Sequence, residues 1–229
     1  MELAADAGTG TGPKETPRPD YWGKRQGAVY LAAARRICQL FSPEPSSVID
    51  VGSNGTPTLE WHRADGTRLV SCDLRKPYRA DGVESVRGDF LAYDETASFE
   101  LVTCFQVLEH VPDAGSFAKK LLAVGRTLIV SVPYKWPKGQ CKYHVHDPVD
   151  DDKMLGWFGR QPTYRYVASE PITGRQRLIH VYAPPDVVVV GTKVTKLEKR
   201  KSGKGFARRA SGKRSFGVRL KNWLRKRLR

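Results

Sequence analysis

Acidic residues end three successive apolar runs of the chain, and a glycine turn follows the first run. The acids are Asp50, Asp73 and Asp89, and the glycines are Gly52 and Gly55. A buried strand, a glycine turn and an acid about twenty residues later are what a doubly wound sheet uses to hold a nucleoside, with the carboxylate on the ribose hydroxyls. The chain is therefore predicted to bind a cofactor that contains adenosine.

The glycine turn narrows the class of cofactor. A dinucleotide needs the spacing G-x-G-x-x-G before a helix N-terminus, whereas this turn carries Gly52 and Gly55, with Pro57 where the helix would begin. The chain also lacks a G-x-x-x-x-G-K-[ST] loop, so a nucleoside triphosphate is unsupported as well. A nucleoside without a chain of phosphates remains.

This part of the chain resembles the class I S-adenosylmethionine-dependent methyltransferases. The resemblance covers about residues 45 to 135. It is strongest over residues 99–111, FELVTCFQVLEHV, which are similar to the fourth strand of that family and the loop after it. Glu100 stands where the family more often has an aspartate.

The resemblance implies S-adenosylmethionine as the cofactor and assigns a place to each landmark. Three residues would shape the pocket for the methionine part: Asp50, Gly52 and Gly55. Asp73 would hold the ribose hydroxyls, and Asp89 with Phe90 would bracket the adenine. Gln106 would lie just beyond the fourth strand, against the cofactor. Without the resemblance, each would be a turn residue or a solvated acid at a strand end.

Histidines follow the predicted strands at the edge where an acceptor would enter. A hydroxyl acceptor needs a base within hydrogen-bonding reach, and histidine has the best-matched pKa. In an extended segment His144 and His146 project to the same side, with Asp147 available to orient one of them. We predict His144 or His146 as the base and Asp147 as its partner; fixing the loop is the alternative role. His110 is expected to pack against this loop.

The H-x-H-D sequence also has a metal-binding interpretation. Together with the acids at 150–152 it could bind a divalent ion that polarises the acceptor hydroxyl. Adjacent acids are equally an ordinary helix N-terminus before Met154, because negative charge suits that end of the helix dipole. The second interpretation is favoured, and no metal site is predicted.

The elements that must position these residues alternate along the chain. Strands are expected at about 47–51, 68–72, 83–87, 99–104 and 126–132, and helices at 29–41 and 114–123. The fold class is therefore α/β, a doubly wound, mostly parallel, Rossmann-like sheet of seven strands. Later runs at 163–169, 176–183 and 187–190 are expected to complete the sheet with an antiparallel edge hairpin. Nucleoside and acceptor should meet at its carboxyl edge.

Charge divides the chain into three parts. The net charge is +15 over 229 residues, yet residues 191–229 hold 16 Lys and Arg against one acid. Residues 1–190 then balance, with 23 basic and 23 acidic residues. We predict a disordered N-terminus at 1–19, one catalytic domain at 20–192 and a basic tail at 193–229.

The basic tail ends in an apolar stripe at helical spacing. Over residues 215–229 this pattern is typical of an amphipathic helix on an anionic membrane surface. Nucleic acid is the competing partner, although an RNA enzyme would extend positive charge toward its active site. The predicted function is O-methylation of a sugar, glycan, lipid-linked or other small-molecule hydroxyl, with RNA methylation as the alternative. The oligomeric state is left open.

Cysteine usage and hydropathy bear on the compartment. The four cysteines show no C-x-x-C spacing and read as reduced thiols. The sequence contains no apolar stretch long enough to cross a bilayer and no apolar core of a signal peptide. A cytoplasmic location, peripheral at the inner face of the membrane, is expected.

Overall fold

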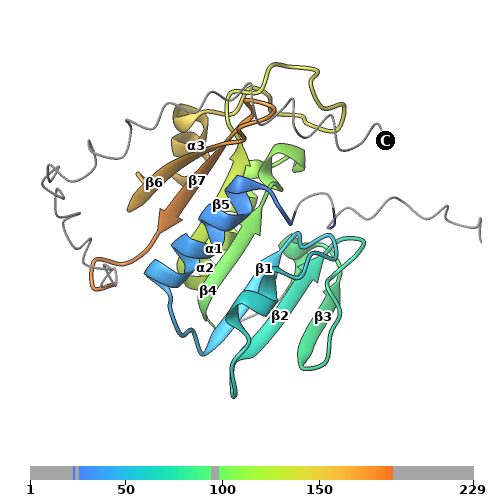
Figure 1. Ribbon diagram of the computed structural model, residues 1–229, viewed down its shortest axis with the longest axis vertical. Coiled ribbons are helices and arrows are strands. Elements are labelled where there is room, and N and C mark those ends of the chain that lie inside the picture. The colour runs from blue at the N-terminus through green and yellow to red at the C-terminus, as the bar shows by residue number, and fades with distance from the viewer. Residues whose placement is uncertain (1–22, 24–25, 94–97, 188–229) are drawn as a thin grey trace, which may run out of the picture. The chain divides into compact units, whose positions relative to one another are not determined.

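Seven strands form one sheet in the computed structural model of the protein (Figure 1). The structure describes residues 23, 26–93 and 98–187. The strands are β1 (Ser47–Val51), β2 (Arg68–Asp73), β3 (Val83–Arg87), β4 (Phe99–Phe105), β5 (Gly125–Pro133), β6 (Tyr164–Ser169) and β7 (Gln176–Tyr182). Their order across the sheet is β3-β2-β1-β4-β5-β7-β6.

The pairing of the strands confirms the predicted fold class. β1 pairs in parallel with both β2 and β4, β2 with β3, and β4 with β5. β7 runs antiparallel to β5 and to β6, which is the predicted edge hairpin. Because the five parallel strands point the same way, the residues after them meet at one carboxyl edge.

Helices cover the two faces of the sheet. They are α1 (Val29–Phe41), α2 (Ala114–Val124) and α3 (Asp151–Phe158), all near their predicted positions. The segments between β1 and β2 and between β3 and β4 carry short 3-10 helices, η1 (Thr58–His62) and η2 (Phe90–Ala92), and a third, η3 (Leu108–His110), follows β4. Pro57 precedes η1 and has no backbone N–H for a helical ladder. The first crossover is therefore compact and brings its residues close to the sheet.

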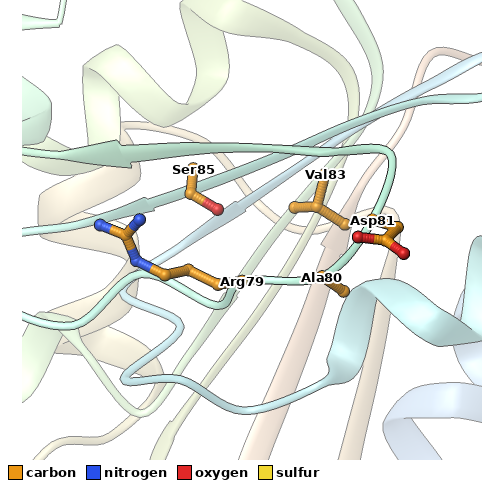
Figure 2. Close-up of a pocket in the computed structure, with 5 residues that line it drawn as sticks. All are labelled: Arg79, Ala80, Asp81, Val83 and Ser85. Atoms are coloured by element: carbon orange, nitrogen blue, oxygen red, sulfur yellow. The ribbon is translucent and has the colours of Figure 1, made fainter.

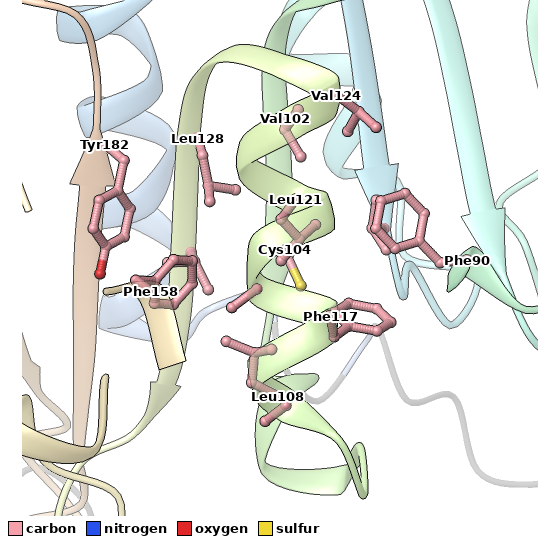
Figure 3. Packing of buried hydrophobic residues seen from close by; sticks show 14 of the residues in the cluster. Phe90, Val102, Cys104, Leu108, Phe117, Leu121, Val124, Leu128, Phe158 and Tyr182 are labelled. Carbon is pink, nitrogen blue, oxygen red and sulfur yellow. The ribbon is translucent and has the colours of Figure 1, made fainter. Parts of the chain in front are cut away.

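A hydrophobic core lies on each face of the sheet. On one face Phe117 and Leu121 of α2 pack against Val102 and Leu128 of the central strands (Figure 3). On the other face, buried side chains of α1 join those of β1, β5 and β7. α1 therefore acts as the packing helix that its apolar stripe predicts.

The state of the cysteines and the lengths of the apolar helices can be compared with the sequence-based expectations. All four cysteines are free, and three of them are buried. Burial raises the pKa of Cys72 to about 11, so its side chain is a protonated thiol. In the portion that the structure describes, no helix has the length and apolar character that crossing a bilayer requires. The predicted N-terminus at 1–19, residues 188–190 of the last predicted strand and the tail at 193–229 lie outside the described residues.

His62 is expected to make stability depend on pH. Burial, and then the charge of Arg35, lower its pKa to about 4, and its Nε2 has no hydrogen-bond partner among the described residues. The unfolded chain takes up this proton near pH 6.5 while the folded protein does not, so stability falls as the pH drops from 6.5 to 4. The loss amounts to about 3 kcal/mol.

Replacing this histidine tests the prediction. His62→Leu should remove that loss, as measured by urea denaturation at pH 7 and pH 4. Wild type and variant are compared at each pH because Asp50, whose pKa is raised to about 6, acts in the opposite direction. An unchanged pH dependence in His62→Leu would contradict the assignment.

Candidate functional site

The carboxyl edge of the sheet gathers the predicted cofactor residues. The first of these, Asp50, is 2% exposed near the end of β1. Its two carboxylate oxygens accept hydrogen bonds from the hydroxyls of Thr58 and Thr103, at 2.5 and 2.7 Å. Burial raises its pKa to about 6, although the two hydroxyls act the other way. Asp50 therefore links the end of β1 to η1 and β4, and its contact with the cofactor stays a prediction.

Gly52 lies where the chain leaves β1 with a positive φ of 78°. A Cβ added here would lie 2.3 Å from Cγ2 of Val107, which follows β4. A side chain would also be strained in this backbone conformation. Gly52 thus lets the turn pass closely against the segment after β4, as a cofactor cradle requires.

Gly52→Ala is expected to lower the free energy of unfolding by about 1 to 3 kcal/mol, because it combines overpacking with backbone strain. Adding Val107→Ala should relieve the clash and leave about 1 kcal/mol of strain. Thermal or urea unfolding measures both variants. A double variant no more stable than Gly52→Ala would show that Val107 is not the obstacle.

Asp73 ends β2 and holds the loops around it. Its Oδ1 accepts from the backbone N–H of Arg75 and of Lys76, at 2.8 and 2.7 Å, and its Oδ2 accepts from that of Asn54 at 2.8 Å. A carboxylate offers about four acceptor positions, so one remains for a further donor. The geometry fits one ribose hydroxyl on Oδ2 rather than a diol held by both oxygens.

Two hollows lie on the β2–β3 side of the sheet. One, of about 510 Å³, runs between the 79–82 turn and β3 and contains no pair of residues suited to acid–base chemistry (Figure 2). The other, of about 460 Å³, reaches Gly55. Four cations line it: Arg75, Lys76, Arg79 and Arg87. None of the four is ion-paired within the part of the chain that the structure describes.

The predicted adenine residues have structural partners. Asp89 caps η2, where its Oδ1 accepts from the backbone N–H of Leu91 at 2.9 Å. Phe90 is 4% exposed, and its ring centre lies 5.1 Å from that of Phe117. The ring therefore belongs to the core between the sheet and α2, and its contact with adenine stays a prediction.

Gln106 stands directly after β4 with a positive φ of 60° and is 9% exposed. Its Nε2 donates to Oγ of Ser131, and its Oε1 accepts from Nε of Arg177, both at 3.1 Å. Its amide is thus held at both ends. Gln106 can face a cofactor with its backbone while its side chain is anchored in the protein.

The loop after β5 brings His144 and Asp147 together. Nδ1 of His144 lies 2.8 Å from Oδ2 of Asp147, and the two side chains are 5% and 2% exposed. Because the carboxylate accepts the Nδ1 proton, the lone pair is placed on Nε2. The ring also contacts those of His110 and Trp136, with centres 4.8 and 5.8 Å away. The structure thus brings together the histidine and the carboxylate of the predicted pair, and their catalytic role stays a prediction.

The extended segment expected around His144 and His146 is not formed, because residues 141–148 contain turns and bends and no strand. The loop turns between them, and Nε2 of His146 lies 2.8 Å from the carbonyl oxygen of Val111. The His146 ring packs against Trp157 instead, with ring centres 5.1 Å apart. Contacts within a folded loop override the alternation that an extended strand would impose. Of the two histidines, His144 has the geometry of a base.

His110 packs against the same loop, as predicted, through its Nδ1, which lies 3.0 Å from the carbonyl oxygen of Tyr143. Glu109, His110 and His144 each bring a possible ligand atom to within 4.8 Å of one another. Both histidines have an acceptor at Nδ1, which is the arrangement that leaves Nε2 for a metal. These three residues could therefore hold a divalent cation.

The acids at 150–152 do not belong to that group. Asp150 caps α3, with Oδ1 accepting from the backbone N–H of Lys153 at 3.0 Å. Asp151 binds Arg165, whose guanidinium holds the pKa of that carboxyl well below its usual range. The helix N-terminus predicted for these acids is confirmed.

Comparison with solved structures identifies the fold of this chain. The chain is similar to the 1,6-didemethyltoxoflavin-N1-methyltransferase of Burkholderia thailandensis, solved with S-adenosylhomocysteine, at 18% identity and a TM-score of 0.58 over 69% of this chain and 80% of that one. The chain has the class I methyltransferase fold. The chain is also similar in fold to N-methyltransferase NodS from Bradyrhizobium japonicum WM9. The identity is 13% and the TM-score 0.59, over 74% of this chain and 94% of that one.

Curated proteins that are similar in sequence to this chain are O-methyltransferases by name. It is 34% identical over 105 residues to the ubiquinone biosynthesis O-methyltransferase of Xanthomonas oryzae pv. oryzae (strain PXO99A), which covers 39% of this chain and 44% of the relative. The protein of that name from Bordetella parapertussis is 32% identical over 106 residues, which cover 40% of this chain and 44% of the relative. The match spans less than half the length of these relatives. No family model matches the chain.

Two buried charged residues at the carboxyl edge of the sheet were not identified from the sequence. Glu109 is 1% exposed beside His110, and Arg177 is 9% exposed beside Gln106. The signal for Glu109 was an acid in an otherwise apolar segment, since such an acid is rarely buried without a reason. Arg177 carried no signal, because it reaches Gln106 across 71 residues of chain.

Proposed function

We propose that this chain is an S-adenosylmethionine-dependent methyltransferase that methylates a hydroxyl oxygen of a small molecule, a glycan or a lipid-linked acceptor. The observation that carries the choice of oxygen is the buried His144–Asp147 pair at the carboxyl edge. The names of the curated relatives, which are O-methyltransferases, point in the same direction.

The residues around the glycine turn suit the proposed cofactor. Gly52 lets the glycine turn lie directly against Val107 after β4, and Oδ2 of Asp73 has an acceptor position for a ribose hydroxyl. S-adenosylmethionine, when bound, supplies an electrophilic methyl group.

The His144–Asp147 pair provides the acid–base chemistry. Nε2 of His144 would take the proton of the acceptor hydroxyl while the oxygen forms a bond to the methyl carbon and the carbon–sulfur bond breaks, which leaves S-adenosylhomocysteine and an imidazolium ring. Asp147 stabilises that charge through Nδ1, as its 2.8 Å contact allows. The Trp136 ring stacks on one side of His144 and shields it from water.

A divalent cation is a second way for the same residues to activate a hydroxyl. Held by Glu109, His110 and His144, it would lower the pKa of a bound hydroxyl as a Lewis acid. Elemental analysis of the purified protein distinguishes the two arrangements: a stoichiometric transition metal or zinc favours the cation, and its absence favours His144 alone.

RNA methylation is the alternative function, favoured by one observation. The four cations around the 460 Å³ hollow give the otherwise neutral catalytic part a local site for phosphates. Tritiated methyl transfer to separate pools of lipid, glycan, RNA and small molecules tests both functions. Label in the RNA pool alone would replace the first proposal with the second.

The basic tail is proposed to bind an anionic membrane surface through residues 215–229. The support is the sequence pattern, with its apolar stripe among cations. Co-sedimentation with phosphatidylserine vesicles, compared with binding to bulk RNA at the same salt concentration, tests this partner. Equal or stronger binding to RNA would contradict it.

A further inference from the structure

One buried arginine contacts three segments that meet at the carboxyl edge. Arg177 is 9% exposed and stands in β7 opposite Pro133, the last residue of β5. Its Nε donates to Oε1 of Gln106 at 3.1 Å. Its guanidinium carbon lies 4.7 Å from the ring centre of Tyr30 and 5.1 Å from that of Trp136. This side chain thus contacts α1, the residue after β4 and the loop after β5.

The charge of Arg177 is matched on the side of α1. Its Nη1 lies 3.9 Å from Oε1 of Glu170. The Glu170 carboxylate accepts from the backbone N–H groups of Val29 and Tyr30, at 3.0 and 3.2 Å. These N–H groups open α1, where a carboxylate also suits the helix dipole. The arginine and the beginning of α1 therefore share one carboxylate.

The Trp136 ring contacts both Arg177 and the proposed base. Its centre lies 5.1 Å from the guanidinium carbon of Arg177 and 5.8 Å from the ring centre of His144, on which it stacks at an interplanar angle of 29°. Nε1 of Trp136 donates to the carbonyl oxygen of Gln176 at 2.9 Å, which fixes the ring along β7. A shift of the guanidinium would be passed to His144 through this ring.

We propose that Arg177 is a positioning residue. It fixes the position of the base His144 relative to Gln106, which lies on the predicted cofactor side of the site. The inference rests on the proposed function. The Nε of Arg177 anchors Gln106, and the guanidinium contacts the Trp136 ring, which stacks on His144. Methyl transfer needs the acceptor oxygen and the methyl carbon in near-attack geometry, and a misplacement of about 1 Å costs on the order of 100-fold in rate.

Arg177→Lys tests this role. Lysine keeps the positive charge near Glu170 but has neither the Nε–H fork nor the planar face of a guanidinium. We expect kcat to fall on the order of 100-fold. The Kd of S-adenosylhomocysteine in calorimetry should change far less than kcat, because Gln106 keeps its hydrogen bond to Ser131, and the melting temperature should stay near the wild-type value.

Two further variants separate positioning from a merely structural role. Arg175→Lys is the matched control, because Arg175 lies 5.0 Å from the same Trp136 ring but is exposed. It should leave kcat unchanged. Glu170→Gln removes the carboxylate charge and keeps an acceptor for α1, so it should lower the melting temperature and leave kcat unchanged.

The outcomes separate this inference from the proposed function. A wild-type kcat in Arg177→Lys overturns the positioning role of Arg177. An equal fall of kcat in Arg175→Lys also overturns it, and so does a fall of kcat that is explained by a lower melting temperature. Failure of the proposed function appears in the wild type instead, as no binding of S-adenosylhomocysteine and no methyl transfer to any pool.

Discussion

His144→Ala should lower kcat by on the order of 100- to 10,000-fold while the Kd of S-adenosylhomocysteine stays unchanged. The reason is geometric: His144 has its Nδ1 on Asp147 and its Nε2 lone pair free for the acceptor proton, and no predicted cofactor residue bonds to it. Single-turnover transfer of a tritiated methyl group measures the chemical step, and calorimetry measures binding.

Two further variants in the loop after β5 test whether His144 is the residue that acts as the base. Asp147→Asn should also lower kcat, because an amide at this place cannot stabilise the imidazolium as a carboxylate does. His146→Ala should retain turnover, since His146 bonds to Val111 and packs on Trp157. Equal losses in His144→Ala and His146→Ala would refute His144 as the base.

The response of His110 distinguishes a base from a cation. If His144 acts alone, His110→Ala should change kcat much less than His144→Ala does. If a cation is held by Glu109, His110 and His144, both variants should lose activity and bound metal together.

Asp73→Ala should raise the Kd of S-adenosylhomocysteine by about 10- to 100-fold, which corresponds to the loss of one hydrogen bond to a charged group. The carboxylate also holds Asn54, Arg75 and Lys76 through their backbone N–H groups, so its removal loosens the loops around the cofactor. Calorimetry measures the affinity, and the melting temperature shows how much of the loss follows from the loops.

The control for Asp73→Ala is a neighbouring acid. Asp81→Ala removes an exposed carboxylate from the 79–82 turn, outside the glycine turn, and should bind S-adenosylhomocysteine as the wild type does. Wild-type affinity in Asp73→Ala would contradict the placement of the ribose and, with it, the proposed cofactor.

Local sequence is sufficient for the sheet and for the place of Gly52 and Asp73 at its carboxyl edge. The inner strands β2 and β4 are largely buried and read as short apolar runs, whereas β3 and the edge strand β6 are partly exposed and carry polar residues. Gly52 and Asp73 stand directly at the ends of β1 and β2. Their positions at the carboxyl edge follow from strand direction alone, because parallel strands end on the same side.

The acceptor side depends on contacts between distant segments. Both His144 and His146 satisfy the chemistry of a base, and the turn of the loop alone pairs one with Asp147 and the other with Val111. Glu109 meets His144 across the β4–β5 crossover, and Arg177 meets Gln106 across the sheet. Periodicity reports which way a side chain faces within its own element. Which residues then meet depends on packing between elements, and no local pattern encodes that.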